Sequence, residues 1–394
     1  MYLGENHMLL IKNGKIFTME GIVLEESSIL IKNGKIEEIG KEIKITKDVE
    51  VIDAKGKIVM PGFIDAHTHI AILEDGIGFE GSDINEMTDP ITPELRAIDA
   101  INPMDTALKD AYKSGVTCAA VGPGSANIIG GQFATIKTYG KRIDNMIIKA
   151  PTAMKCAFGE NPKRVYNSKG KSPMTRMATA ALFREILMKT KEYDRKIKSA
   201  GEDESKRPKF DIKLESMLPV IHGEIPLKAH AHRSDDIFTA IRMAKEFGLK
   251  LTLDHCTEGH LIADELAKEG YDTIVGPSLT SKSKYELREK SFKTPGVLSK
   301  AGLKVAITTD CPVIPLEYLP ICASLAVKSG MDREEALKAI TINPAQILGI
   351  DHRVGSIKKG KDADIVIFDG DPLEIQSKVL YTIVDGNIIY KLDI

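Results

Sequence analysis

The sequence predicts an α/β protein, a (β/α)8 barrel of the TIM type with a small β-sandwich domain formed from both ends of the chain. In the middle of the chain, short apolar strands alternate with longer amphipathic helices, which is typical of a parallel sheet. About eight such units follow one another, and this number favours a closed barrel over an open sheet. Both ends of the chain are instead rich in β-prone residues and resemble each other.

The predicted β-domain comprises residues 1–60 and 350–394. Its first part contains one short motif twice, at Ile11–Ile16 and Ile31–Ile36, where Asn-Gly between β-prone residues indicates a hairpin turn. A related Asp-Gly turn occurs near the other end of the chain, after the β-branched run Ala363–Phe368. Because the two ends carry the same signals, we expect them to build one domain rather than two separate appendages.

Residues 61–349 are predicted to form the barrel. Its strands are expected at the apolar segments 58–65, 116–121, 154–158, 227–231, 251–254, 273–275 and 305–308. The segments 103–113, 235–247 and 332–340 have apolar residues at intervals of three and four, as helices do. A long stretch rich in Lys and Arg, around residues 165–210, breaks this rhythm. We expect it to be a solvated helical insertion rather than a lid over the active site.

The composition restricts the classes of function. Of the 394 residues 43% are hydrophobic and 28% are charged, and the net charge is −2, so neither nucleic acid nor a membrane is an expected partner. The first residues contain no basic stretch followed by a long apolar one, so no signal peptide or membrane span is predicted. The five cysteines form no CxxC pair, which is typical of reduced thiols and predicts a cytoplasmic protein.

The segment Pro61-Gly-Phe-Ile-Asp-Ala-His67-Thr-His69 carries the strongest chemical signal. Residues two apart in a strand face the same side, so both imidazoles can reach one metal ion. His230, His255 and Asp310 each follow or end a predicted strand. Side chains at the carboxyl ends of barrel strands share one cavity. Together these residues predict a site for one or two divalent metal ions, with Zn²⁺ favoured and Mn²⁺, Fe²⁺ or Co²⁺ as alternatives.

With these residues the chain resembles the amidohydrolase superfamily, in the branch of the imidazolonepropionase-like proteins and metal-dependent dipeptidases. Residues 354–368 resemble the usual start of the second half of the β-domain, and residues 341–345 resemble the usual last barrel helix. The resemblance covers nearly the whole chain. Its motifs are specific to the superfamily and not to one substrate.

The resemblance implies roles for the candidate ligands. His67 and His69 would hold the more buried metal ion, and His230 and His255 a second one. Asp310 would bind the first metal ion and act as the general base toward the attacking water.

Binuclear members of the superfamily also need a bridging anion from the fourth strand, either a carboxylated Lys or a Glu. Lys155 and Glu160 are both candidates. Lys155 precedes a stretch of small residues and glycine, as in a related pattern, whereas Glu160 is closer to the expected strand end and needs no modification. The sequence slightly favours Glu160 and leaves Lys155 open.

Six polar residues are predicted to contact the substrate: Asn127, Gln132, Asn161, Arg164, His232 and Arg233. Deaminases and imidazolonepropionases of the superfamily carry a Glu three residues after His230, where this chain has Arg233, which argues against both activities. Arg233 and Arg164 favour a substrate with a carboxylate. The alternative for Arg233 is a salt bridge at the start of the next helix. Asn127 and Gln132 belong to the glycine-rich segment 122–132, whose alternative role is a connecting loop.

The predicted function is a metal-dependent hydrolase that cleaves a C–N bond of an amide, cyclic amide or peptide-like small molecule by metal-activated water. The alternatives are a deaminase, lactonase or phosphoesterase of the same fold. A non-catalytic relative is disfavoured because every expected ligand position is filled. The sequence leaves a homo-oligomer open.

Overall fold

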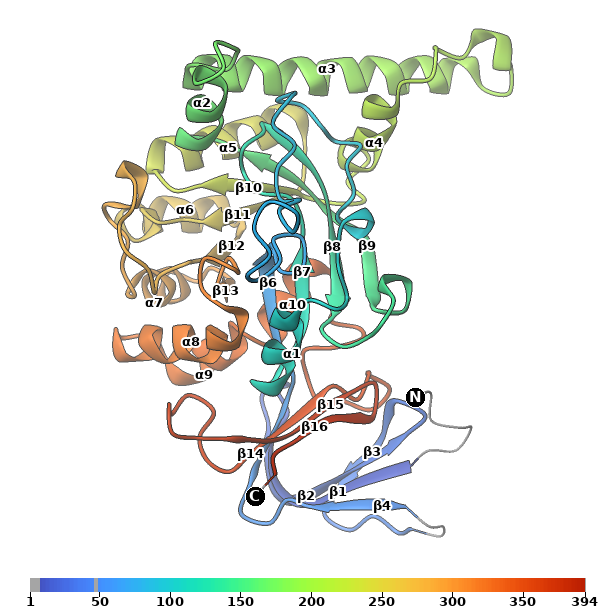
Figure 1. Ribbon diagram of the computed structural model, residues 1–394, viewed down its shortest axis with the longest axis vertical. Helices are drawn as coiled ribbons and strands as arrows, with labels where there is room; N and C mark the ends of the chain where they lie inside the picture. The colour runs from blue at the N-terminus through green and yellow to red at the C-terminus, as the bar shows by residue number, and fades with distance from the viewer. Residues whose placement is uncertain (1–7, 46–48, 394) are drawn as a thin grey trace.

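The computed structural model describes residues 8–45 and 49–393. The first seven residues, which belong to the segment considered above for a signal peptide, lie outside the described residues. Figure 1 shows a large α/β part and, at one end of it, a smaller part made of strands. Among the described residues, no helix combines the length and the apolar character needed to span a bilayer.

The large part is built on an eight-stranded sheet in the order β13-β12-β11-β10-β9-β8-β7-β6. Its strands are β6 Phe63–Thr68, β7 Val116–Val121, β8 Ile129–Lys137, β9 Ile147–Ala157, β10 Leu227–Ala231, β11 Leu251–His255, β12 Asp272–Val275 and β13 Val305–Ile307. The two outermost strands approach each other, because the Thr308 hydroxyl donates to the His67 carbonyl at 2.6 Å. The amide of His69 also donates to the Cys311 carbonyl at 2.7 Å. The sheet is therefore nearly closed.

One strand departs from the predicted parallel order. β8 runs antiparallel to both β7 and β9, whereas the other neighbouring strands are parallel. The reason is the length of the connection, since only residues 122–128 separate β7 from β8. A parallel return needs a crossover of about a dozen residues or more, so a short link forces the chain back alongside the strand it has left. The segment 122–132 is thus a loop that becomes a strand at Ile129.

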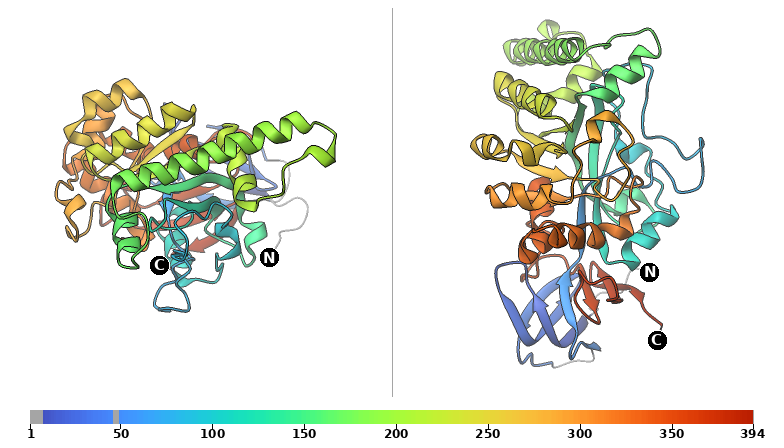
Figure 2. Two further views of the ribbon diagram at one scale, coloured as in Figure 1. Left: turned by 90° about the horizontal axis from the view of Figure 1, so that it is seen from above. Right: turned by 90° about the vertical axis from the view of Figure 1, so that its left-hand side faces the viewer.

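Helices cover the outside of this sheet, and Figure 2 shows those coloured green to orange along one side of it. They are α1 Thr106–Lys113, α2 Glu160–Asn167, α3 Arg176–Ala200, α4 Ile212–Ile221, α5 Ser234–Phe247, α6 Ala263–Glu269, α7 Thr294–Lys300, α8 Leu319–Lys328, α9 Arg333–Lys338 and α10 Ile342–Leu348. The expected helical insertion contains α3, which lies across the end of the molecule opposite the small part (Figure 1). Its apolar face is buried, with the Phe183 ring 5.3 Å from that of Phe158.

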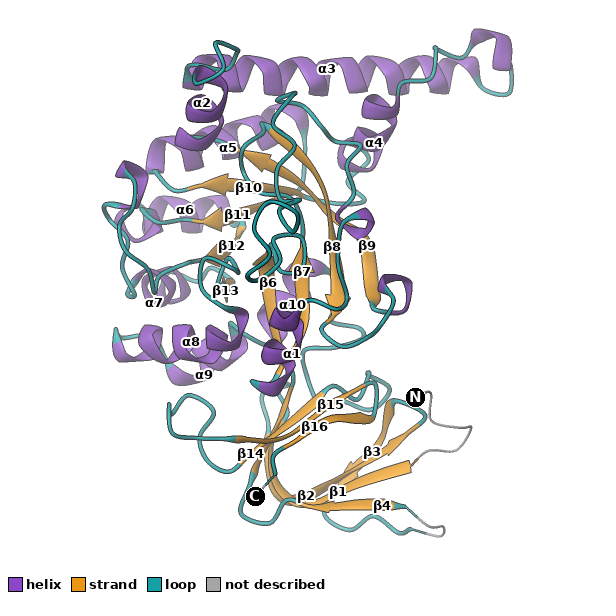
Figure 3. Cartoon of the chain, viewed as in Figure 1, coloured by secondary structure: helices purple, strands orange, loops and turns teal. Residues whose placement is uncertain are grey.

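Strands from both ends of the chain form a second sheet, in the order β16-β15-β14-β5-β1-β2-β3 with β4 beside β1. They are β1 Met8–Phe17, β2 Val23–Lys32, β3 Lys35–Gly40, β4 Glu50–Asp53, β5 Ile58–Pro61, β14 Ile365–Phe368, β15 Val379–Val384 and β16 Asn387–Lys391. Where the sequence predicts a sandwich, the described residues form one connected sheet. β1 makes this possible, because it pairs with β2 along one edge and with β4 and then β5 along the other. In Figure 3 loops alone join the described strands of this part.

A buried lysine joins the two parts. Lys137, at the end of β8, lies 3.1 Å from Asp362, 2.5 Å from Asp364 and 3.2 Å from Asp385. Burial alone would lower the pKa of the Lys137 ammonium, but these carboxylates, with Asp364 first, raise it above its ordinary value. The ammonium of the barrel sheet therefore stays charged and holds the acidic turns of the second sheet.

Candidate metal centre

The histidines singled out in the sequence meet at one end of the large sheet. His67 lies in β6, His230 in β10 and His255 at the end of β11, while His69 and His232 follow their strands directly. All five side chains are buried, with at most 6% of any residue exposed. Burying an imidazole costs free energy unless each of its nitrogens has a hydrogen-bond partner or a metal ion. The partners of these nitrogens therefore indicate which of them are available to a metal ion.

The first cluster consists of His67, His69 and Asp310. One ligand atom from each lies within 4.8 Å of the others. The Nε2 atoms of His67 and His69 are 3.4 Å and 3.2 Å from Asp310 Oδ1, which is buried and receives no hydrogen bond. His69 Nδ1 donates to the Gly122 carbonyl at 2.6 Å, so its Nε2 carries the lone pair that faces Asp310. Three electron-pair donors thus face one another without a proton between them, an arrangement that a cation satisfies.

The second cluster consists of His230, His232 and His255, again with one ligand atom of each within 4.8 Å of the others. His255 Nδ1 donates to the Gly276 carbonyl at 2.7 Å, and its Nε2 is buried without a partner. His232 Nδ1 shares a hydrogen bond with the Thr257 hydroxyl at 2.7 Å. The sequence assigned His232 to the substrate, whereas here it lies beside two predicted metal ligands.

The backbone at two of these residues is strained. His255 and Asp310 have φ angles of 75° and 55°, in the left-handed region that residues with a Cβ rarely adopt. Such strain costs on the order of 1–3 kcal/mol per residue and persists only where the surroundings enforce it. Asp310 belongs to the first cluster and His255 to the second, so the strained backbone lies at the candidate site, where strain is commonly found.

Lys155 reaches the site from β9. Its side chain is fully buried, with Nζ 3.1 Å from His67 Nε2 and 3.9 Å from Asp254 Oδ2. Burial lowers the pKa of Lys155 to about 8, so part of the side chain is a neutral amine near neutral pH. The other candidate, Glu160, lies beyond the end of β9 as the first residue of α2. Its carboxylate belongs to neither cluster of ligand atoms.

A buried ion pair that the sequence analysis missed lies beneath the first cluster. Asp254 Oδ2 is 2.7 Å from His67 Nδ1, and Asp254 Oδ1 is 3.2 Å from Lys228 Nζ. Burial alone would raise the pKa of Asp254, but the Lys228 ammonium and His67 hold it well below its usual range. A signal for Lys228 was present, since it lies two residues before His230 in a strand and therefore faces the same side.

Glu286 and Lys284 were also missed. They lie on the segment after β12, where Tyr285–Leu287 forms a short 3-10 helix. The Glu286 side chain is buried, and its Oε1 is 3.6 Å from His232 Nε2 and 3.7 Å from His230 Nε2. Lys284 Nζ lies 2.6 Å from the same oxygen. Burial alone would raise the pKa of Glu286, but the Lys284 ammonium and the backbone amide of Glu160 lower it below its ordinary value, so the carboxylate is charged.

Of the remaining residues predicted to contact substrate, Asn161 lies at the site. Its Nδ2 donates to the Ser125 hydroxyl at 2.8 Å and is 3.5 Å from His230 Nε2. Its Oδ1 accepts from Lys284 at 3.0 Å. Arg164 is an exposed residue of α2. The structure therefore brings an amide and an ammonium, rather than Arg164, close to the second cluster.

Three other predicted substrate residues already have protein partners. Arg233 forms a bidentate salt bridge with Asp235 at 3.0 Å and 2.8 Å, the alternative that the sequence analysis left open. Asn127 is buried, donates to the Glu86 carbonyl and the Thr92 hydroxyl, and accepts from Tyr166. Gln132 donates to the Pro93 carbonyl at 3.2 Å. These bonds fix loops around the site, so Asn127 would have to lose one to bind a ligand.

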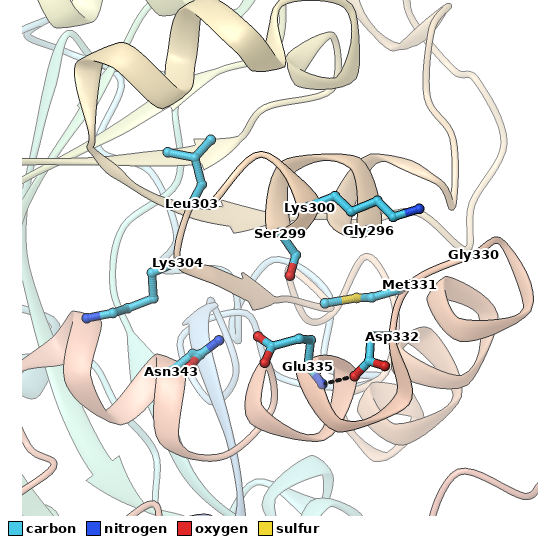
Figure 4. A pocket seen from close by; sticks show the side chains of 11 residues that line it. Gly296, Ser299, Lys300, Leu303, Lys304, Gly330, Met331, Asp332, Glu335 and Asn343 are labelled. Carbon is cyan, nitrogen blue, oxygen red and sulfur yellow. Dashed lines mark hydrogen bonds between the residues drawn. The ribbon is translucent and has the colours of Figure 1, made fainter. Parts of the chain in front are cut away.

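A separate cavity of about 760 Å³ lies near the start of β13, shown in Figure 4. Lys304, which immediately precedes β13, lines it together with Lys300, Glu335 and Asn343. Asp310 follows the opposite end of the same strand, so this cavity does not belong to the two histidine clusters.

Comparisons with known proteins agree with this picture. The model of the amidohydrolase family matches residues 58–390. The crystal structure of an amidohydrolase from Thermotoga maritima MSB8 is 42% identical, covers 98% of this chain and 100% of its own, and has a TM-score of 0.94. The amidohydrolase tasK of Hapsidospora irregularis is 28% identical over 91% of this chain, which spans only 39% of that protein. An imidazolonepropionase of Thermoplasma volcanium is 26% identical over 88% of this chain and 85% of its own length.

Proposed function

Because the chain belongs to the amidohydrolase family, we propose that it cleaves an amide, cyclic amide or peptide-like bond in a small substrate that carries a carboxylate. The chain is an enzyme, a metal-dependent hydrolase of C–N bonds. The observation that carries the proposal is the pair of buried clusters at the carboxyl ends of one nearly closed sheet. This is where the catalytic side chains of TIM-type barrels gather, and we assign the sheet to that type with one reversed strand.

We assign the first divalent metal ion to His67, His69 and Asp310. Two imidazoles and a carboxylate, with a buried oxygen that receives no hydrogen bond, are a donor set suited to Zn²⁺. When bound, such an ion would lower the pKa of a coordinated water to about 7 and polarise the scissile carbonyl.

Asp310 is the proposed general base. Its Oδ1 is buried, receives no hydrogen bond and lies 3.4 Å and 3.2 Å from the Nε2 atoms of His67 and His69, so it faces the proposed position of the metal ion. It would take the proton from the attacking water and pass it to the leaving nitrogen. The adjacent imidazole of His67 is neutral, since burial lowers its pKa to about 3.

Lys155 is the proposed bridging residue of the fourth strand, in place of the slightly favoured Glu160. Its support is the 3.1 Å approach to His67 and the complete burial of its amine. A neutral amine can add to CO2 and, with release of a proton to solvent, give a carbamate that would supply an anionic ligand, and a lowered pKa favours that neutral form. Glu160 has no comparable approach to either cluster.

The substrate class rests on the groups at the rim. Arg233 is already paired with Asp235, so Lys284 and Asn161 are the proposed partners of a substrate carboxylate. Lys284 is half-buried and lies within 2.6 Å of Glu286 next to the second cluster. A cytoplasmic location is also proposed, because all five cysteines are buried and free.

Metal analysis and a substrate panel test the proposal together. Protein purified without chelator or affinity metal would be measured by elemental mass spectrometry, and we expect two equivalents of divalent metal per chain. The metal-replete protein would then be assayed on dipeptides, N-acyl amino acids and cyclic amides, with the corresponding esters, lactones and phosphoesters as controls. Preferred turnover of amides that carry a carboxylate supports the proposal. Absence of metal after reconstitution with Zn²⁺ or Mn²⁺, or turnover of the control classes alone, would overturn it.

A further inference from the structure

We propose that His232 and Glu286 are ligands of the second divalent metal ion, alongside His230 and His255. Neither residue belongs to the ligand set implied by the family resemblance. The inference rests on the proposed function only in taking His230 and His255 as metal ligands. It adds a third imidazole and a carboxylate, so that the second ion has four ligands of its own.

The three imidazoles already converge. One nitrogen of each lies within 4.8 Å of the others, and the ring centroids of His230, His232 and His255 are 4.4–4.7 Å apart. The Nδ1 atoms of His232 and His255 are held by Thr257 and by the Gly276 carbonyl. Hydrogen bonds of this kind fix the ring orientation of a metal-binding histidine and leave Nε2 for the ion.

Glu286 completes the set from a different segment of the chain. Its Oε1 is buried, lies 3.7 Å from His230 Nε2 and 3.6 Å from His232 Nε2, and has the Lys284 ammonium 2.6 Å away. With metal–ligand bonds of about 2.0–2.2 Å, two ligand atoms on a tetrahedral ion lie about 3.4 Å apart. The observed separations differ from this by only a few tenths of an ångström. A small rotation of the carboxylate would therefore bring it into a coordination shell.

Lys284 offers a competing explanation for Glu286. Its ammonium lies 2.6 Å from Oε1, and in this explanation the carboxylate serves only as its counter-ion. However, Lys284 also donates to Asn161 Oδ1 at 3.0 Å, so it retains an acceptor when the carboxylate turns toward a metal. The counter-ion role also leaves the unpartnered Nε2 of His255 unexplained. The two roles predict different outcomes when Lys284 is removed.

The test measures metal binding rather than turnover. Metal-free wild type and the variants His232→Gln, Glu286→Gln and Lys284→Met would be titrated with Co²⁺, followed by its visible absorption and by elemental analysis after gel filtration. We expect two equivalents in the wild type and in Lys284→Met. In His232→Gln and Glu286→Gln we expect one tight equivalent, with the affinity of the second site lowered by more than ~100-fold, beyond the effect of losing an outer partner of a ligand.

Each outcome separates the alternatives. Two equivalents of wild-type affinity in both His232→Gln and Glu286→Gln would overturn the inference and leave the proposed function intact. Loss of the second equivalent in Lys284→Met as well would assign Glu286 to the ion pair and would also overturn it. Failure of the wild type to bind any Co²⁺ would overturn the proposed function itself. Urea unfolding of the metal-free variants would show that each is folded, so that a lost equivalent reports on a lost ligand.

Discussion

Replacing Asp254 by asparagine tests the buried ion pair beneath the first cluster. The substitution keeps the shape of the side chain and removes the negative charge that lies 3.2 Å from Lys228 and 2.7 Å from His67. Removing one partner of a buried pair costs ~3–5 kcal/mol, because the other charge remains without compensation. We expect the lower end, about 3 kcal/mol, because the amide oxygen still accepts from Lys228. Burial already lowers the pKa of Lys228, which eases the loss of its proton.

The same change should weaken metal binding at His67. Asp254 orients the imidazole through Nδ1, and losing such an outer partner typically lowers metal affinity by ~10–100-fold. For a chain of this length, a loss of about 3 kcal/mol corresponds to a fall in Tm of about 4 °C. Calorimetry of the metal-free protein would measure the fall in Tm. Competition with a chelating dye for Zn²⁺ would measure the loss of metal affinity.

The double variant Asp254→Asn/Lys228→Met is the matched control. With both charges gone, no ammonium is left unpaired, so the double variant should lose less stability than the sum of the two single variants. If Asp254→Asn changed neither the Tm nor the Zn²⁺ affinity, the ion pair would have no part in holding His67. Additive losses in the double variant would refute the coupling between Asp254 and Lys228.

Three further outcomes follow from the site. Asp310→Asn should lower kcat by ~10²–10⁴-fold, the range for a lost general base, while elemental analysis still finds bound metal. Lys155→Ala should lower the metal content, whereas Glu160→Gln should not, and the reverse result would restore Glu160 as the bridge. As the pH falls from 6.5 to 5.5, the free energy of unfolding of the metal-free protein should fall by about 1 kcal/mol for each of His67, His230 and His232. Their folded pKa values are lowered by burial, so the unfolded chain takes up the protons. Urea unfolding at both pH values measures this loss, and a flat profile would contradict it.

The sequence was informative where a side chain's direction follows from its strand. His67 and His69 differ by two positions and therefore face one side, and the parallel strands of a barrel bring their carboxyl ends to one rim. His230 and His255 could be predicted as site residues from their position at or near the end of a strand alone. The structure accordingly brings all four histidines to one end of the large sheet, together with Asp310. The family assignment was confirmed for the same reason, since the motif and the strand ends are its signature.

The sequence was less informative where direction depends on the path of a loop. Glu286 lies on a segment without a periodic pattern, so nothing in its neighbours indicated that it reaches two histidines. Arg233 could serve a substrate or Asp235, and only the geometry of the helix start decides between them. The reversed strand β8 was missed because the glycines at 122–131 indicate a loop, although the strand already begins at Ile129.

The composite second sheet has a consequence for synthesis on the ribosome. β5 pairs with β14, so the first five strands are complete before their partners from the other end of the chain exist. Roughly 300 residues separate the two strands, and at ~5–20 residues per second the edge of β5 waits roughly 15–60 s for β14. An unpaired edge that exposes Val59 and Met60, both buried in the finished fold, is open to pairing with other nascent chains. The rate at which the ribosome translates the barrel therefore sets how long that edge depends on chaperones.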